Sequence, residues 1–179
     1  MSLDQQQPNT TAPDPELEAH RARIYAMLDT DGDGTVSRHD YFVRIDWAQQ
    51  ASGRADDDPL VIAARVTGEK AWAAMDADGD GFLTFDQYNG WVDGEKFDDI
   101  CKDALAALFD LGDGDGDGAV TREEFATLRE VLGNRPENAR AAFDLLDTDE
   151  DGYVRRDEYL AAIRAYVTGA PSPMGTVLY

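Results

Sequence analysis

The apolar positions of the chain recur in a fixed relation to runs of acidic residues, and this relation repeats four times. An aromatic residue lies four positions before each run, and in three repeats another apolar residue directly precedes the run. A spacing of four places two side chains on one face of a helix, so the pattern predicts a helix ahead of every acidic run. The aromatic residues are Tyr25, Trp72, Phe109 and Phe143, and the directly preceding residues are Leu28, Met75, Gly112 and Leu146.

A second set of apolar residues follows each acidic run and predicts a second helix there. Their spacing is typical of helix faces that turn toward a core, and an aromatic ligand-binding box is the alternative interpretation. Asp58-Pro59 and Asn134-Arg135-Pro136 are typical of helix starts. The apolar residues of this set are Tyr41, Phe42 and Ile45, then Tyr88 and Trp91, then Phe125, Leu128 and Leu132, and finally Tyr159, Leu160, Ile163 and Tyr166.

Each acidic run has carboxylates at alternate positions and is closed by a glycine. Ca²⁺ takes six to eight hard oxygens, and carboxylates at positions 1, 3 and 5 of a curled loop converge on one point. Glycine at position 6 permits the sharp turn that directs the next backbone carbonyl at the ion. The sequence therefore predicts four calcium loops, residues 29–40, 76–87, 113–124 and 147–158. Their first three acidic ligands are Asp29, Asp31 and Asp33; Asp76, Asp78 and Asp80; Asp113, Asp115 and Asp117; and Asp147, Asp149 and Asp151.

The second half of each loop has the features that pairing and metal binding require. Position 8 is aliphatic in all four, which predicts a short antiparallel contact between paired loops. Position 9 can hold a bridging water through a hydroxyl in three loops, but Arg155 accepts no hydrogen bond and carries its charge near the ion. Position 7 offers its backbone carbonyl as a ligand. The residues at position 7 are Thr35, Phe82, Ala119 and Tyr153, and those at position 8 are Val36, Leu83, Val120 and Val154.

Position 12 distinguishes the loops most, because a bidentate carboxylate there supplies two of the oxygens. Glu124 and Glu158 meet this requirement, which predicts that the third and fourth loops bind Ca²⁺ most tightly. Asp40 is one methylene shorter, which favours a smaller coordination and tolerance of Mg²⁺ in the first loop. Gln87 is neutral and monodentate. We therefore expect three strong sites and a weak or structural second loop.

The charge of the chain limits the classes of partner. Its formal net charge is −21, from 37 acidic and 16 basic residues. Nucleic acid and anionic membranes are therefore not expected partners, since both attract basic proteins. The acidic residues alternate with a periodic apolar pattern, and 42% of the residues are hydrophobic, which favours a folded core over a disordered acidic tail. The metal-free chain should repel itself, so folding should be coupled to metal binding.

The remaining chemistry-bearing residues form no recognisable catalytic set. Cys101 is the single cysteine, which rules out an intramolecular disulfide, and we interpret it as an ordinary helix residue. His20 and His39 have no nucleophile around them in the sequence, so no enzymatic activity is expected. Residues 1–15 lack the apolar segment of a secretory signal, and no run approaches the length of a membrane span. A cytoplasmic protein is expected.

The four loops, each flanked by two helices, resemble the EF-hand superfamily. The long spacer between the first two loops, the weakened second loop and the apolar end are similar to sarcoplasmic calcium-binding proteins, and more closely to the bacterial protein calerythrin and its actinobacterial relatives. The resemblance covers residues 16–179. It implies a compact α-helical monomer that buffers or transports calcium, often with the first, third and fourth loops active. The second loop departs from it by keeping Asp76, Asp78, Asp80 and Gly81.

We therefore expect an all-α fold, with four EF-hands as two pairs in a compact single globule and a short antiparallel loop–loop contact in each pair. The first pair would span residues 16–92 and the second pair residues 93–169. Residues 1–15 would form a disordered tail. Residues 170–179 would dock in the apolar cleft through Val177, Leu178 and Tyr179, with a frayed terminus as the alternative.

A calcium buffer is the function that these features favour, and a calcium sensor is the alternative. A sensor opens on binding calcium and grips its target with a methionine-rich groove. This chain has four methionines, and only Met27 and Met75 lie in predicted helices that face a core. It also lacks a charged connector between two separate lobes. The sequence identifies no protein target.

Overall fold

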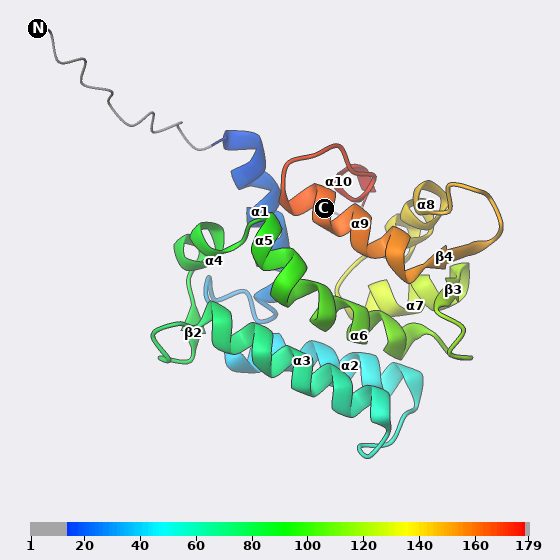
Figure 1. Cartoon of the computed structure of the whole chain (residues 1–179), viewed down its shortest axis with the longest axis horizontal. Coiled ribbons are helices and arrows are strands. Elements are labelled where there is room, and N and C mark those ends of the chain that lie inside the picture. Colours follow the sequence, from blue (N-terminus) through cyan, green and yellow to red (C-terminus); the bar gives the residue numbers. More distant parts are fainter. Residues whose placement is uncertain (1–13, 178–179) are drawn as a thin grey trace, which may run out of the picture.

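Each predicted calcium loop lies between two helices in the computed structural model, which describes residues 14–177 (Figure 1). None of the helices in this part of the chain is long and apolar enough to cross a membrane. The elements in chain order are α1 (Pro15–Leu28), β1 (Val36–Ser37), α2 (Arg38–Ser52), α3 (Pro59–Met75), β2 (Phe82–Leu83), α4 (Phe85–Trp91), α5 (Gly94–Lys96), a π-helical turn η1 (Phe97–Cys101), α6 (Lys102–Gly112), β3 (Ala119–Thr121), α7 (Arg122–Val131), α8 (Pro136–Leu146), β4 (Tyr153–Arg155), α9 (Arg156–Val167) and α10 (Met174–Val177).

The helix starts follow from local sequence chemistry. The Asp58 side chain accepts a hydrogen bond from the N–H of Leu60, 2.8 Å away, and Pro59 occupies the first turn of α3, where its missing N–H costs nothing. Asp14 and Pro15 open α1 in the same way, so this helix begins one residue before the boundary expected at 16. The rest of the expected N-terminal tail, residues 1–13, lies outside the described residues.

The loops pair as the aliphatic residues at position 8 predict. β1 pairs with β2 and β3 with β4, both antiparallel, with Val36 opposite Leu83 and Val120 opposite Val154. All four of these side chains are fully buried. Each strand pair therefore joins two loops back to back and closes the core beneath them.

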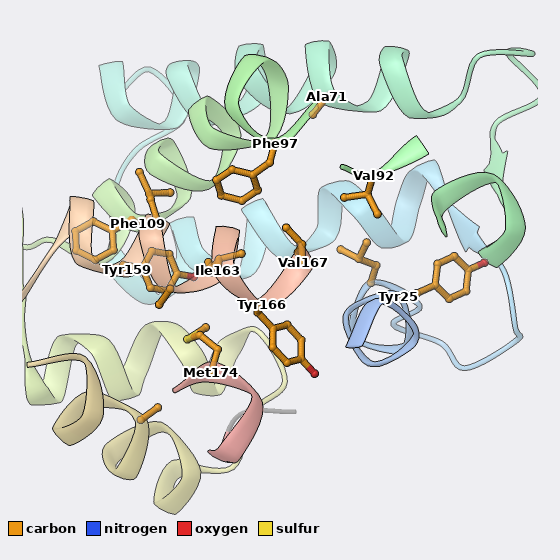
Figure 2. Packing of buried hydrophobic residues seen from close by; sticks show 14 of the residues in the cluster. Tyr25, Ala71, Val92, Phe97, Phe109, Tyr159, Ile163, Tyr166, Val167 and Met174 are labelled. Atoms are coloured by element: carbon orange, nitrogen blue, oxygen red, sulfur yellow. The ribbon is translucent and has the colours of Figure 1, made fainter. Parts of the chain in front are cut away.

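The aromatic residues four positions before each acidic run fix the loops to the core. All four are buried, and Tyr25 and Phe109 are among the core residues seen in Figure 2. Their backbone carbonyls accept hydrogen bonds from the N–H groups of the first loop residues, at 3.1 Å for Asp29 and 3.3 Å for Asp113. The last helical turn and the first loop residue are thus joined in every repeat, because the same bond occurs from Asp76 to Trp72 and from Asp147 to Phe143.

A second cluster of buried residues joins the two pairs. It includes Ile45 of α2, Val61 of α3, Leu111 of α6 and Leu128 of α7, so it contains helices from both halves of the chain. Helix α6 lies along α2 and α3 in Figure 1, and its contacts with them are extensive. The predicted all-α architecture with two loop pairs in one globule is therefore confirmed.

The helix that enters the third loop contains a feature that the sequence analysis missed. A helix ahead of the third acidic run was predicted, but residues Phe97–Cys101 form a π-helical turn between α5 and α6. Such turns are rare, occur mostly as single turns inside α-helices and frequently accompany functional sites. Phe97 is 2% exposed, so the widened turn is part of the core wall.

The C-terminal segment docks on the second pair through a methionine. Met174 is fully buried, and α10 contacts both α8 and α9. The Ser172 hydroxyl donates to the carbonyl of Ala162, 2.6 Å away, and holds the segment against α9. Leu178 and Tyr179 lie outside the described residues, as does the side chain of Val177, so their predicted docking stays a prediction.

We predict that Met174→Ala lowers the free energy of unfolding by about 2–4 kcal/mol, because it removes a fully buried side chain and leaves a cavity. Chemical denaturation of the calcium-loaded protein measures this change. Leu145→Ala is the matched control, since Leu145 lies on α8 with 46% of its surface exposed. Equal losses in the two variants would show that the C-terminal segment contributes nothing to stability.

Candidate metal centres

Every predicted loop brings three carboxylates together. In each loop, one oxygen from each of three aspartates lies within 4.8 Å of the other two. Two oxygens bound to one Ca²⁺ are at most about 5 Å apart, so the spacing fits this ion. Positions 1, 3 and 5 form the group in the later three loops, whereas Asp29, Asp31 and Asp40 form it in the first. The three later groups are Asp76, Asp78 and Asp80; Asp113, Asp115 and Asp117; and Asp147, Asp149 and Asp151.

Backbone N–H groups of the loop hold the aspartate at position 1. In all four loops its carboxylate accepts a hydrogen bond from the N–H of the glycine at position 6, at 2.8–3.1 Å. These glycines have φ angles of 86–95°, a left-handed conformation that favours glycine. The glycine therefore forms the turn and also positions the carboxylate at position 1. The glycines are Gly34, Gly81, Gly118 and Gly152.

The aspartate at position 5 accepts a hydrogen bond from the N–H of position 7 in every loop. The distances are 2.8 Å to Thr35, 2.9 Å to Phe82, 2.9 Å to Ala119 and 3.0 Å to Tyr153. The backbone of each position 7 residue is therefore held by a carboxylate of its own loop. That its carbonyl oxygen binds the ion stays a prediction. In the first loop, Asp33 also accepts from the Thr35 hydroxyl and lies outside the three-carboxylate group.

The side chain at position 12, a predicted metal ligand, also takes part in capping the helix that follows the loop. Its side chain accepts from the N–H of position 9, and it is the third residue of the helix that leaves the loop. The position 9 hydroxyl in turn receives the N–H of position 12 in the first three loops, which completes a reciprocal capping box. The pairs are Ser37 with Asp40, Thr84 with Gln87, Thr121 with Glu124 and Arg155 with Glu158.

The Asp40 carboxylate accepts more hydrogen bonds than a capping box alone provides. It is 2% exposed and accepts hydrogen bonds from Thr30 and Ser37, through both the backbone and the hydroxyl of each. Burial raises the pKa of Asp40, but these hydrogen bonds outweigh it and bring the pKa to about 2. The carboxylate is therefore ionised at neutral pH and available as a metal ligand. Its side chain is one methylene shorter than the glutamates at this position in the third and fourth loops.

The Gln87 side chain points its NH₂ group, a hydrogen-bond donor, at the acidic residues of the second loop. Its amide oxygen accepts from the N–H and hydroxyl of Thr84 at 2.7 and 2.8 Å, while its NH₂ donates to Asp78 at 3.2 Å. An amide NH₂ cannot bind a cation. A hydrogen-bond donor thus faces the acidic cluster of the second loop where the other loops have a carboxylate.

The third loop has a complete set of acids and an additional contact from the first pair. Glu124 accepts from the N–H of Gly114 as well as from Thr121, so it reaches both ends of the loop. The linker between α2 and α3 lies close by, because Arg54 donates to the carbonyl of Asp113 at 3.1 Å and pairs with Asp58. No motif in the sequence predicts this contact between distant segments.

The fourth loop differs from the others at two positions. Arg155 lies over the loop acids, with its guanidinium 2.6 Å from Asp151 and 3.8 Å from Asp149. This hydrogen bond lowers the pKa of Asp151 and raises that of Arg155, so the pair resists separation. Glu150 has a φ angle of 56°, where the other loops have glycine, and this conformation costs a non-glycine residue about 1–2 kcal/mol.

Comparisons with known proteins agree with this geometry. The family model described as an EF-hand domain pair matches residues 102–164, and the model described as an EF hand matches residues 26–41. A rice protein (Oryza sativa subsp. japonica), probable calcium-binding protein CML28, is 32% identical in an alignment of 136 positions, and the match covers 65% of this chain and 72% of that protein. The chain belongs to the EF-hand family of calcium-binding proteins.

Solved EF-hand structures extend the likeness over most of the chain. A calcium-binding protein from Streptomyces coelicolor is 28% identical, with a TM-score of 0.73 over 87% of this chain and 100% of that chain. The photoprotein clytin has a TM-score of 0.77 at 21% identity, over 92% of this chain and 94% of that chain. This second likeness concerns the fold alone.

We predict that Gln87→Glu tightens calcium binding at the second EF-hand loop on the order of tenfold or more, because a carboxylate replaces an amide that donates toward the ion. Calorimetry would give the affinity, and the amide resonance of Gly81 would report on this loop. Gln50→Glu adds the same charge on the exposed surface of α2 and should leave the loop unchanged. Unaltered binding in Gln87→Glu would mean that loop geometry limits this site.

We also predict that Arg155→Gln strengthens calcium binding at the fourth loop several-fold, because the guanidinium competes with the ion for Asp149 and Asp151. The amide resonance of Gly152 during a calcium titration measures this site. Arg65→Gln removes an exposed arginine that pairs with Asp46, away from any loop, and is the matched control. Weaker binding in Arg155→Gln would show that the arginine organises the site.

Proposed function

We propose that the protein is an intracellular calcium buffer or transporter. The support for this is that, in the described part of the chain, the C-terminal segment and the two pairs cover apolar faces of one another. Met174 is buried where α10 contacts α8 and α9, and α2, α3, α6 and α7 share a cluster of buried apolar residues that joins the two pairs. A protein that stores calcium needs no exposed groove, whereas a sensor must open one for its target.

The proposed number of bound ions is three strong Ca²⁺ sites and one weak or structural site. The first and third loops have an acid at position 12. The second loop has the donor of Gln87 facing its acids, which supports a weak site there. The fourth loop was expected to bind tightly, but Arg155 and the strained Glu150 both reduce the affinity that its acids alone would provide. We retain the proposal that the first loop also accepts Mg²⁺.

A calcium-dependent regulator is the second candidate. One observation favours it: the Streptomyces coelicolor calcium-binding protein, 28% identical, carries out prokaryotic calcium-mediated regulation. In this chain, such a role would require α10 to leave its place against α8 and α9. The target would be a protein of unknown identity. A monomeric state, a cytoplasmic location and the lack of nucleic acid or membrane partners stay predictions.

A calcium titration in the presence of a dye for exposed apolar surface separates the two candidates. For a buffer we expect at least three Ca²⁺ per chain, without a rise in dye fluorescence as the last sites fill. A chain that lacks residues 171–179 is the positive control, since it loses Met174 and should bind the dye. A fluorescence rise in the full chain that follows calcium occupancy would favour the sensor, and two or fewer ions would contradict the proposed sites.

A further inference from the structure

Arg54, in the turn between α2 and α3, joins the first EF-hand pair to the third calcium loop. Its guanidinium Nη2 donates to the backbone carbonyl of Asp113 at 3.1 Å, across 59 residues of sequence. The turn and the loop that follows α6 lie at the same side of the molecule in Figure 1. The Arg54 side chain is 21% exposed, so most of it is shielded from water. A residue of the first pair thus holds the residue that opens a calcium loop of the second pair.

Asp113 is fixed by hydrogen bonds at its N–H, its carboxylate and its carbonyl. Its N–H donates to the carbonyl of Phe109 at 3.3 Å, which ends α6. Its carboxylate accepts from the N–H groups of Gly116 and Gly118, at 2.7 and 2.8 Å. The bond from Arg54 adds the carbonyl to this set, and Asp113 is only 2% exposed. The direction of this predicted calcium ligand therefore depends in part on a contact from outside its own loop.

The direction of the Arg54 guanidinium is set by the residue that caps α3. Arg54 Nη1 lies 3.1 Å from one carboxylate oxygen of Asp58, and the other oxygen accepts from the N–H of Leu60 at 2.8 Å. The hydrogen bonds from the Leu60 backbone and from Arg54 lower the pKa of Asp58, so this carboxylate is ionised at neutral pH. The Arg54 carbonyl accepts from the side-chain amide of Gln49 at 3.3 Å. The end of α2 and the start of α3 thus both hold the arginine.

Arg54 contacts its loop in a different way from Arg155. The Arg155 guanidinium lies 2.6 Å from a carboxylate oxygen of Asp151, where it competes with the ion. Arg54 bonds to the backbone carbonyl of Asp113, which is not a predicted calcium ligand. The charge of Arg54 is also balanced by its ion pair with Asp58, which weakens its repulsion of a cation. We therefore expect the two arginines to affect calcium binding in opposite directions.

We propose that Arg54 is a positioning residue of the third loop, and that it couples calcium binding there to the start of α3. Calcium that fixes Asp113 also fixes the acceptor of Arg54, which in turn holds Asp58 at the first turn of α3. The coupling is reciprocal, so an ordered turn between α2 and α3 raises the calcium affinity of the third loop. This inference rests on the proposed calcium binding at that loop and adds a connection between the two pairs.

The sign of one substitution tests the positioning role. Arg54→Gln should weaken calcium binding at the third loop about threefold or more, the size expected for one lost hydrogen bond. The amide resonance of Gly118 during a calcium titration of the full chain measures this site. Removal of a positive charge alone would tighten binding at an acidic loop, so tighter or unchanged binding would overturn the proposal. Arg164→Gln is the matched control and should leave this site unchanged, since it removes an exposed arginine that pairs with Asp98.

A double-mutant cycle tests whether Asp58 acts through Arg54. Asn caps a helix as well as Asp does, so Asp58→Asn keeps the first turn of α3 but removes the charge that orients the guanidinium. We expect Asp58→Asn to weaken calcium binding at the third loop about twofold in the unaltered chain and to have no further effect in Arg54→Gln. Equal losses in both backgrounds would show that Asp58 acts independently, which contradicts the proposed coupling.

The transmission itself is measured at the amide resonance of Leu60. In the unaltered chain it should shift with the same calcium midpoint as Gly118, and in Arg54→Gln this shift should be lost. Glu124→Gln, which removes the position 12 carboxylate of the third loop, should move both midpoints together to higher calcium. A Leu60 resonance that ignores calcium would refute the coupling. A Gly118 resonance that ignores calcium would contradict the proposed site itself, whereas equal Gly118 midpoints in the chain and in Arg54→Gln would refute only the role of the arginine.

Discussion

The mutual repulsion of carboxylates is the constraint on which the rest of this structure depends. Four times, three acidic oxygens lie within 4.8 Å of one another in a chain of net charge −21. The folded chain opposes this repulsion with the hydrogen bonds that it can offer: the N–H of position 6 to position 1, of position 7 to position 5, and of position 9 to position 12. Calcium completes an arrangement that the backbone has already directed toward one point.

The same hydrogen bonds explain why ligand positions and helix ends coincide. Position 12 caps the outgoing helix, and position 1 ends the incoming helix through its bond to the aromatic residue four positions earlier. Metal binding, helix capping and core packing therefore share residues. Apolar residues next to positions 1 and 12, such as Leu28, Met75 and Tyr159, belong to the core, so a displaced loop acid would move residues of the core.

The features that depend on local spacing could be predicted from the sequence. The loops, the buried aromatic residues and the register that places Val36 opposite Leu83 follow from positions a few residues apart, for which geometry is nearly fixed. The sequence also predicted that Gln87 is a weak ligand. Only the structure shows that its NH₂ group donates to Asp78. The charge of Arg155 was noticed, but its hydrogen bond to Asp151 was not.

The features that were missed depend on contacts between distant segments or on backbone geometry without a sequence signature. The π turn at Phe97–Cys101 has no marker residue. The docking of Met174 was missed, because the sequence does not show how deeply this methionine is buried. The docking predicted for Val177, Leu178 and Tyr179 stays a prediction. Glu150 was identifiable in principle, since glycine occupies its position in the other three loops, a comparison that predicts a positive φ angle.

The contact between Arg54 and the carbonyl of Asp113 has a consequence for the history of the fold. Arg54 belongs to the long spacer within the first pair, and it donates to the opening residue of the third loop. Fourfold repetition suggests a chain assembled by duplication of interchangeable units. A spacer that reaches across to the other half ends that interchangeability, because each half is now adapted to its neighbour. Exchange of whole pairs between related proteins by recombination would therefore break contacts that exchange of single loops preserves.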